Sequence, residues 1–402
     1  MTQGAKKVGS ARDAIWLLAA LAVPMPWLLA VLRDGAGLSY EISTPLAGIA
    51  IVGAAFLLSW AVELAERDIP QSLAILVLAL ISVLPEYAVD LHFAIRAASE
   101  PSYAHYAVAN MTGANRLLIG LGWAAVALLA CWRGRIRHLA IPSHQRLEMR
   151  FLLLSTLYSF VIPLNGEIDL VDAAVLLGLF LWYVAAAAKG HREETELAGP
   201  AAWIEARVGN KTRRLIVTAL LLFSAGAIFV SAEPFAEGLV HIGTSYDIDK
   251  FLLVQWVAPL ASESPEFVIA LLFAWRHRGA LGLGALISSK VNQWTLLVGA
   301  LPIAYAVAKG AFVGLPLDDR QTEELWLTSA QSLLATLLIC DLDFTRLEAV
   351  LLAAAFGVQL FFPDTEVRKA FSVLYVVIFF MLLLYSPERR NGFLALLRPH
   401  WR

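Results

Sequence analysis

The sequence of 402 residues has few charged side chains and only two cysteines. Asp, Glu, Lys and Arg make up 16% of the residues, whereas soluble domains contain about 25%. Hydrophobic residues make up 59%, and the mean hydropathy is +0.68. These values exclude an ordinary soluble domain and indicate a polytopic membrane protein. Cys131 and Cys340 each stand alone in apolar sequence, which predicts buried thiols and neither a disulfide framework nor a metal-binding cysteine cluster.

Two further classes of protein are excluded by what the sequence lacks. The net charge is −2 and no basic face is available, so no nucleic-acid partner is expected. The chain has no His-x-x-x-His and no Gly-x-Ser-x-Gly segment, the patterns that would indicate a zinc site or a nucleophilic serine. We therefore expect that the protein is not an enzyme and carries no cofactor.

Long apolar segments recur along the chain and predict about twelve transmembrane helices. A helix needs about 20 apolar residues to cross a membrane. Lys6, Lys7 and Arg12 precede the first apolar run, which we interpret as a retained span because it is too long for a signal peptide and no obvious cleavage site follows. The predicted spans are residues 14–33, 44–64, 70–96, 105–131, 150–165, 168–189, 213–241, 248–276, 280–308, 325–341, 345–362 and 367–386.

The distribution of Lys and Arg predicts the orientation of these spans. With the N-terminus inside, the inside segments hold 22 of these residues and the outside loops hold 7. Because positive residues favour the cytoplasmic side of a membrane, both termini are predicted to be cytoplasmic. We expect a multi-pass protein of the cell (inner) membrane, with membrane lipid as one partner.

Two glutamates lie inside predicted spans, and each directly follows a proline. A charged side chain in hydrocarbon costs about 3 kcal/mol on insertion scales, so Glu86 and Glu266 are expensive to place there. Proline has no N–H group to continue the helical hydrogen bonding. The carbonyls of Ile81 and Ala261, four residues before each proline, therefore lose their usual donor. Two matching segments of this kind predict a binding site.

Three features recur along the chain at nearly one interval, which indicates a duplicated half. Five spans separate equivalent helices, so the two halves are predicted to be inverted in the membrane, as in many secondary transporters. The interval is 180 residues from Glu86 to Glu266, 177 from Asn115 to Asn292, and 176 between the acidic segments that begin at Glu167 and Asp343.

The predicted fold is an all-α polytopic membrane protein with two inverted-topology repeats of five transmembrane helices and one extra helix at each end. Four acidic residues of the recurring segments, namely Asp169, Asp172, Asp343 and Glu348, are expected to cap helix starts. The predicted organisation is an extra span in 1–43, a first repeat in 44–189, a cytoplasmic linker in 190–212, a second repeat in 213–362, and an extra span with a basic tail in 363–402.

Oxygen-bearing side chains accompany the two glutamates and predict a site for a hard cation. The set contains hydroxyl, amide and carboxylate oxygens without His or Cys, which suits Ca²⁺ or Na⁺. Two apposed carboxylates repel each other unless a proton or a cation lies between them. Proton and metal would then compete for one place, which is the minimum that an antiporter requires. The neutral members of this set are Ser262, Asn110, Asn115 and Asn292.

Leu84-Pro85-Glu86 and Asn110-Met111-Thr112-Gly113-Ala114-Asn115 resemble the motifs of the cation/calcium exchanger superfamily, which includes the sodium/calcium exchangers. That family carries Gly-Thr-Ser-Leu-Pro-Glu and Gly-Asn-x-x-Gly-Ser-Asn in both repeats. The resemblance extends over roughly residues 44–362. It implies ten core spans, alternating access, and Glu86 and Glu266 as the central metal ligands.

The chain departs from the family pattern at several positions within these motifs. Asp90 stands where the family has Ser or Thr, and it adds a carboxylate one turn after Glu86. Glu263 adds another before the second Pro-Glu pair, and Ile287 or Ser288 replaces the first Asn of the second signature. These departures change the set of ligands that the resemblance implies.

Lys290 is a further departure, because it occupies the place of a family glycine. It could pair with Glu263 or Asp90 as a fixed counter-ion that replaces one transported sodium. It could instead lose its proton and take part in proton coupling, or extend away from the site towards an interface. Arg116 is expected to form a salt bridge with Asp90 or to reach an interface.

The sequence therefore predicts a secondary antiporter that exchanges Ca²⁺ or a similar cation against Na⁺ or H⁺. A sodium/proton exchanger of the same fold and a non-transporting membrane sensor or scaffold are the alternatives. The sequence leaves open the ion pair, the stoichiometry and the oligomeric state. The expected cation-binding residues are Glu86, Glu266, Asp90, Asn110, Asn115, Ser262, Glu263, Asn292 and the carbonyls of Ile81 and Ala261, with Lys290 as a coupling or counter-ion residue.

Overall fold

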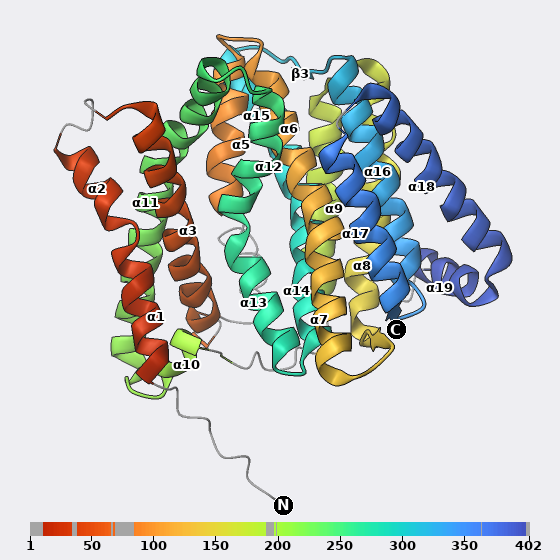
Figure 1. Ribbon diagram of the computed structural model, residues 1–402, viewed down its shortest axis with the longest axis horizontal. Coiled ribbons are helices and arrows are strands. Elements are labelled where there is room, and N and C mark those ends of the chain that lie inside the picture. The colour runs from red at the N-terminus through yellow and green to blue at the C-terminus, as the bar shows by residue number, and fades with distance from the viewer. Residues whose placement is uncertain are drawn as a thin grey trace, which may run out of the picture. The chain divides into compact units, whose positions relative to one another are not determined.

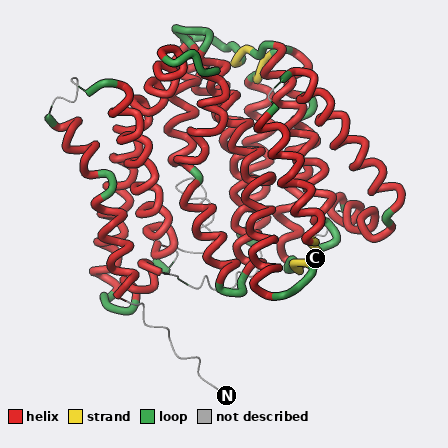
Figure 2. The backbone as a smooth tube through the Cα atoms, in the orientation of Figure 1, coloured by secondary structure: helices red, strands yellow, loops and turns green. Residues whose placement is uncertain are grey.

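The computed structural model describes residues 11–33, 38–65, 67–68, 84–189, 197, 199–362 and 364–398. Helices make up most of this part of the chain, and the strands in it are short (Figures 1 and 2). The chain forms two compact units. The first contains Met1–Val89 and Ala187–Ile248, and the second contains Asp90–Ala186 and Asp249–Arg402.

The first unit is built on two long helices that lie side by side (Figure 1). Two glycines allow their close approach, because a Cβ atom at Gly238 would lie 1.8 Å from Thr44 Oγ1 and one at Gly48 would lie 2.8 Å from the Phe235 ring. The long helices are α3 (Tyr40–Ala65) and α11 (Asn210–Ser245), and the shorter α1 (Ala11–Ala22), α2 (Met25–Leu32) and α10 (Gly199–Glu205) pack against them.

An ion-pair cluster ties the ends of three of these segments together. Arg213, at the start of α11, donates to both carboxylate oxygens of Asp68 at 2.9 and 3.0 Å and to both of Glu205 at 2.8 and 2.9 Å. The Arg214 Nε also lies 2.8 Å from Asp68. The hydrogen bonds from Arg213 hold the pKa of Asp68 below its usual range. The cluster therefore fixes α10, in the predicted linker, against the turn that follows α3.

The second unit contains the remaining helices. It begins within α5 (Leu84–Ala97), which starts in the first unit. The others are α6 (Tyr103–Leu117), α7 (Ala124–Gly134), α8 (Arg146–Ser159), α9 (Leu170–Ala187), α12 (Lys250–Ser262), α13 (Ser264–Trp275), α14 (Gly279–Asn292), α15 (Val298–Lys309), α16 (Asp319–Ile339), α17 (Arg346–Phe361), α18 (Thr365–Tyr385) and α19 (Pro387–Leu397), with 3₁₀ turns η2 (Ser143–Gln145) and η3 (Ile162–Asn165).

Two long helices of this unit share an uncommon feature. α6 continues into α7 through the π-helical turn η1 (Leu118–Trp123), and α14 continues into α15 through η4 (Gln293–Leu297). The turn η1 begins three residues after Asn115, and η4 begins directly after Asn292. π-Helical turns are rare and are frequent at functional sites. The two predicted Asn-bearing helices are thus alike in local structure as well as in sequence.

The sequence predicted no strands, but four short ones form two antiparallel pairs. β1 (His138–Ala140) pairs with β4 (Asp343–Thr345), and β2 (Glu167–Ile168) pairs with β3 (Leu315–Pro316). Each pair therefore joins one strand from the first predicted half to one strand from the second. Two or three residues give no alternating hydrophobic pattern that is long enough to recognise in a sequence.

The predicted caps are confirmed at two helix starts. Asp169 accepts hydrogen bonds from the backbone N–H groups of Val171 and Asp172 at the start of α9. Glu348 forms a capping box with Thr345 at the start of α17. The prediction for Asp343 was wrong, because this residue lies in β4 and its carboxylate lies 2.8 Å from His138 Nδ1.

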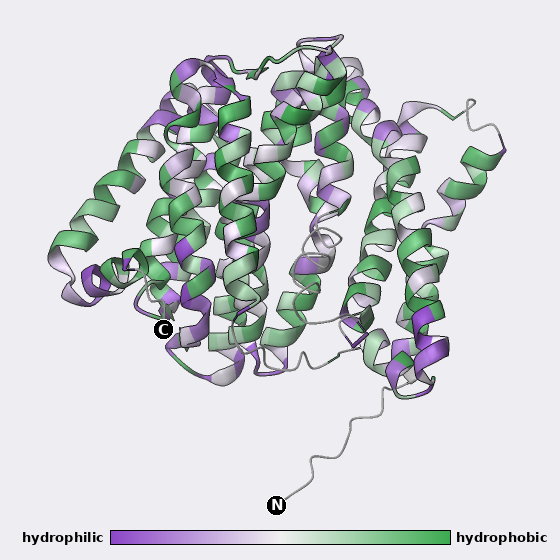
Figure 3. Cartoon of the chain, turned by 180° about the vertical axis from the view of Figure 1, so that it is seen from behind, coloured by the Kyte–Doolittle hydropathy of each residue, from purple (hydrophilic) through white to green (hydrophobic). Residues whose placement is uncertain are grey.

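In the described part of the chain, eight helical segments are long and apolar enough to span a membrane, or nine if α12 and α13 form one span. Apolar residues run along the helices and hydrophilic residues gather at helix ends and connections (Figure 3). The predicted spans 325–341 and 345–362 coincide with α16 and α17, which are not among the eight. α16 carries buried polar side chains that lower its hydropathy, and α17 has 16 residues. Most of 70–96 lies outside the described residues.

Both cysteines are free and buried, as predicted. The described chain is a helical, multi-pass membrane protein, and most of its buried polar side chains lie within the second unit. Fully buried polar side chains on α16 include Thr328, Ser329, Gln331 and Ser332. A helix with such a polar face needs protein neighbours to satisfy its hydroxyl and amide groups.

Candidate functional site

The predicted site residues are carried by α5, α6, the junction of α12 and α13, and α14. Glu86 lies on α5 within the first unit and is 1% exposed, and Ile81 lies outside the described residues. The residues in the second unit are Asp90 on α5, Asn110 and Asn115 on α6, Ala261, Ser262, Glu263 and Glu266 at the junction, and Lys290 and Asn292 on α14.

The predicted span 248–276 consists of two helices, α12 and α13, that meet at a bend. The axes of the two helices differ by 57°. Residue 265 is a proline, so the carbonyl of Ala261 lacks its helical donor, and Ser264 Oγ donates to that carbonyl instead at 3.2 Å. Ser262 Oγ donates to the Ala258 carbonyl at 3.3 Å. Ser262 Oγ also lies 3.5 Å from the Pro259 carbonyl, which it can share as an acceptor. Both predicted oxygen ligands thus make local hydrogen bonds and keep lone pairs for another partner.

Glu263 lies at the bend and is fully buried. Its Oε1 accepts a hydrogen bond from Gln293 Nε2 at 2.7 Å, while its Oε2 has no hydrogen-bond partner among the described residues. The sequence reasoning missed Gln293. Its signal was available, because Gln293 directly follows Asn292 in an apolar span where a second amide needs a partner.

Asp90, in the first predicted half, is held by a carboxamide in the same way as Glu263 in the second. It is fully buried, and its Oδ1 accepts a hydrogen bond from Asn110 Nδ2 at 2.7 Å. In the described part of the chain its Oδ2 has no partner. Each of these added carboxyls is therefore held by a carboxamide from the following long helix and leaves one oxygen open.

Lys290 is fully buried, which excludes an extension to a membrane interface. Its Nζ donates to Asn115 Oδ1 at 2.8 Å and to the Asn115 carbonyl at 3.1 Å, and it lies 4.6 Å from the centre of the Trp294 ring. The predicted pairing with Glu263 or Asp90 is therefore replaced by hydrogen bonds to Asn115. Asn115 Nδ2 in turn donates to the Met111 carbonyl at 2.8 Å, which orients the amide oxygen towards the ammonium group.

Arg116 forms a buried ion pair that the sequence reasoning assigned to the wrong partner. Its Nη2 lies 2.6 Å from Glu324 Oε2 on α16, and both side chains are 2% exposed. The guanidinium group also lies 5.0 Å from the ring centre of Trp256 on α12. Neither Asp90 nor an interface is its partner. Glu324 was not among the predicted partners, and it directly precedes the predicted span 325–341.

The polar face of α6 is held close to α12 by a glycine. A Cβ atom at Gly113 would lie 1.9 Å from the carbonyl oxygen of Gln255. No larger residue fits there without moving one of the two backbones. This contact holds the α6 segment between Asn110 and Asn115 against α12, which ends at Ser262, directly before Glu263.

Besides Asp90 and Glu263, three predicted ligands keep oxygens without a hydrogen-bond partner among the described residues, namely Asn110 Oδ1, Glu266 Oε2 and Asn292 Oδ1. No group of three or more His, Cys, Asp or Glu side chains in the described chain could hold a metal ion by itself. A bound cation would therefore need amide, hydroxyl or carbonyl oxygens in addition to carboxylates. Hard cations such as Ca²⁺ accept such mixed oxygen sets.

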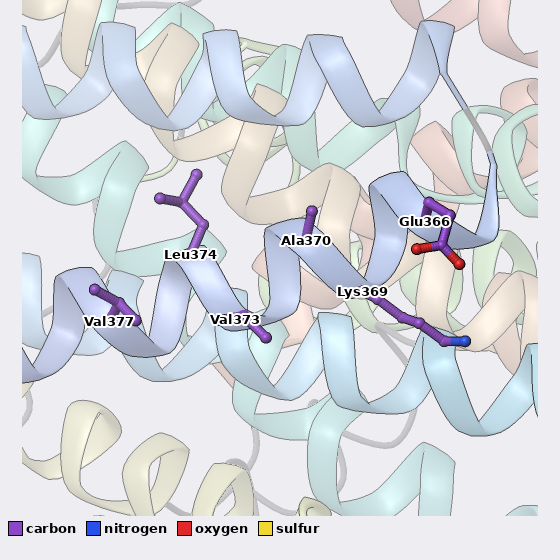
Figure 4. Close-up of a pocket in the computed structure, with 6 residues that line it drawn as sticks. All are labelled: Glu366, Lys369, Ala370, Val373, Leu374 and Val377. Atoms are coloured by element: carbon purple, nitrogen blue, oxygen red, sulfur yellow. The ribbon is translucent and has the colours of Figure 1, made fainter.

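Two surface hollows are lined by other residues. One of about 520 Å³ lies against one face of α18, where Glu366 and Lys369 precede an apolar row (Figure 4). A second of about 640 Å³ is lined by ionisable residues near the starts of α12, α16 and α18, including Asp249, Asp318 and Glu323. Neither hollow is lined by a predicted cation ligand.

Comparisons with known proteins agree with this arrangement. The sequence profile described as sodium/calcium exchanger protein matches residues 45–189 and 216–386. The crystal structure of the H⁺/Ca²⁺ exchanger CAX is 44% identical and superimposes with a TM-score of 0.91, over 96% of this chain and 98% of that one.

Two curated relatives match more distantly. An uncharacterised membrane protein of Methanocaldococcus jannaschii is 27% identical over 179 residues, which are 44% of this chain and 53% of that protein. A putative antiporter CaxA of Alkalimonas amylolytica is 22% identical over 142 residues, which are 35% of this chain and 42% of that protein. The matched segments thus span about half the length of these relatives.

Proposed function

The chain belongs to the sodium/calcium exchanger protein family, and from that premise we propose that it is a secondary antiporter that exchanges Ca²⁺ for H⁺. The family consists of transporters and not of catalytic enzymes. The likeness to the H⁺/Ca²⁺ exchanger CAX over nearly the whole chain supports this ion pair. The sodium/proton exchanger and the non-transporting scaffold are less well supported, because neither accounts for that likeness.

One observation in this chain carries the proposal. Glu263 and Glu266 lie three residues apart at a helix break inside a span, and each keeps one carboxylate oxygen without a hydrogen-bond partner in the described residues. Buried charges normally occur paired or bound to a metal. Open carboxylate oxygens at a broken helix are therefore suited to exchange one positive partner for another, a cation for protons.

We assign Glu86 and Glu266 as the cation ligands, each at the start of a helix that follows a proline. Asn292 and the carbonyl of Ala261 complete the part of this set that lies in the second unit. Asp90 and Glu263, both held by carboxamides, belong to the same polar region. Carboxylate, amide and carbonyl oxygens together supply the mixed set that Ca²⁺ prefers.

The duplicated architecture is part of the proposal. Two inverted repeats, within 44–189 and 213–362, with an extra helix in 1–43 and in 363–402 and a linker in 190–212, would give twelve spans and two cytoplasmic termini. The reciprocal pairing of β1 with β4 and β2 with β3 supports this plan, because a twofold operation that exchanges the halves maps one pair onto the other. The matching π-helical turns support it too.

Reconstitution tests the proposed exchange. Purified protein in liposomes is loaded at low internal pH, and uptake of radioactive Ca²⁺ is followed with the membrane voltage clamped by an ionophore. We expect uptake that depends on the outward H⁺ gradient and that is absent under an outward Na⁺ gradient alone. Uptake driven only by Na⁺ would replace the proton by sodium. No Ca²⁺ uptake under either gradient would contradict calcium antiport.

A further inference from the structure

The ammonium group of Lys290 has the surroundings of a bound monovalent cation. It donates hydrogen bonds to the amide oxygen and the main-chain oxygen of Asn115, and it lies 4.6 Å from the centre of the Trp294 ring. Carbonyl oxygens and aromatic faces are the neutral groups that bind small cations in proteins. Lys290 is fully buried, so these protein groups and not bulk solvent surround its ammonium group. The Lys290 side chain therefore holds its terminal amino group against the oxygens of Asn115, where a small cation could otherwise bind.

The first half of the chain has no such cation at the equivalent position. Gly113 lies 177 residues before Lys290, the same interval that relates Asn115 to Asn292. No side chain fits at Gly113, because a Cβ atom there would meet the Gln255 backbone. Of the two equivalent asparagines, Asn115 is occupied by the ammonium group, while Asn292 Oδ1 has no hydrogen-bond partner among the described residues.

Two ionisable groups lie near Lys290, namely Glu263, which would attract an ammonium group, and Arg116, which would repel it. Arg116 is itself paired with Glu324, so Lys290 is the cation left to balance Glu263 within this cluster. Hydrogen bonds to Asn115 keep the ammonium group from closing on the Glu263 carboxylate, whose Oε1 is held by Gln293.

We propose that Lys290 is a tethered cation that takes the place of a transported Na⁺ at Asn115. It sets ion specificity by removing the one oxygen pair that would otherwise accept sodium, and it leaves Asn292 and Glu266 for the transported cation. This inference rests on the proposed antiport function, and it names the ion that the site rejects.

Two substitutions separate the charge of Lys290 from its volume. Lys290→Gly copies the residue of the first half and opens the space beside Asn115, whereas Lys290→Met removes the charge but keeps the space filled. H⁺-driven Ca²⁺ uptake by the unmodified chain should be insensitive to external NaCl relative to choline chloride. Uptake by Lys290→Gly should fall by about tenfold when Na⁺ is added, as an ion with a newly available site would compete. Lys290→Met should stay insensitive.

A binding measurement decides the question even if a variant does not transport. The melting temperature of purified Lys290→Gly should rise with NaCl but not with choline chloride, and neither the unmodified chain nor Lys290→Met should respond. Equal responses of all three proteins to Na⁺, or none in Lys290→Gly, would overturn the tethered cation. Failure of the unmodified chain to move Ca²⁺ would instead contradict the proposed function, and it would leave the sodium-induced stabilisation of Lys290→Gly as a separate result.

Discussion

The two long helices α6–η1–α7 and α14–η4–α15 are alike in form and different in chemistry. They run from Tyr103 to Gly134 and from Gly279 to Lys309. Each contains a π-helical turn close to an asparagine, Asn115 in the first and Asn292 in the second. The first presents Asn110 and Arg116 to its neighbours, whereas the second presents Lys290 and Gln293. The local backbone is thus alike in the two helices, while their polar side chains differ.

The difference shows how each half stabilises its buried charges. On the first helix a carboxamide holds Asp90 and the guanidinium of Arg116 is neutralised by Glu324 on α16. On the second helix a carboxamide holds Glu263, and Lys290 donates a hydrogen bond to Asn115 on the first helix. The amide–carboxyl pair is common to both halves, and the placement of the basic residue is not. We therefore expect the two halves to contribute unequally to transport.

The largest effect on transport is expected at Glu266, whose equivalent in the first half of the sequence is Glu86. Glu266→Gln keeps the shape of the side chain but removes its charge, so Ca²⁺ uptake into liposomes should fall to background. The matched control is Glu148→Gln on α8, another largely buried glutamate that the site does not include, and it should retain uptake. Equal activity of the two variants would remove Glu266 from the site.

The buried ion pair of the first helix should dominate stability. Arg116→Met removes the partner that lies 2.6 Å from Glu324 and leaves this buried carboxylate with Arg368 Nε at 3.8 Å, and breaking a buried pair in this way costs about 3–5 kcal/mol. The double variant Arg116→Met/Glu324→Gln removes both charges and should recover most of that loss. Denaturant or thermal unfolding in detergent measures both. An additive loss in the double variant would show that the two residues are not coupled.

The smallest effect is expected far from both helices in sequence, at Asp68 in the first unit. Arg213 lowers the pKa of Asp68 in the folded state, so its contribution to stability is complete above the pKa of the unfolded chain and is lost as pH falls through the lowered value. Asp68→Asn should therefore be less stable than the unmodified chain at neutral pH, by about 1 kcal/mol. The difference should vanish in strong acid, and a difference that grew on acidification would refute this assignment.

The sequence predicted the parts of the fold that depend on long apolar runs. Spans such as 105–131, 280–308 and 367–386 match observed helical segments within a few residues. The bend at 57° could be expected from Pro265 only as a weak point, since a proline kinks some helices and ends others. The strand pairs escaped prediction because they are two or three residues long and their partners are remote in sequence.

The candidate site was predictable in its residues and not in its partners. A glutamate that follows a proline in an apolar run can be recognised in the sequence, and so can the carboxamide residues downstream of it. Which buried base meets which buried acid depends on the rotation of each helix about its axis, and sequence spacing does not give that rotation. Arg116 therefore pairs with Glu324 and not with Asp90, and Lys290 donates hydrogen bonds to Asn115 and not to Glu263.

The central claim is that carboxylates inside the membrane exchange a cation for protons. The most direct test records both ions at once, with a calcium indicator and a pH indicator inside the same voltage-clamped liposomes. The account predicts that adding external Ca²⁺ produces calcium entry and proton exit together, and that Glu266→Gln abolishes both signals. Calcium entry without any proton exit from the liposomes, or proton exit that persists in Glu266→Gln, would contradict it.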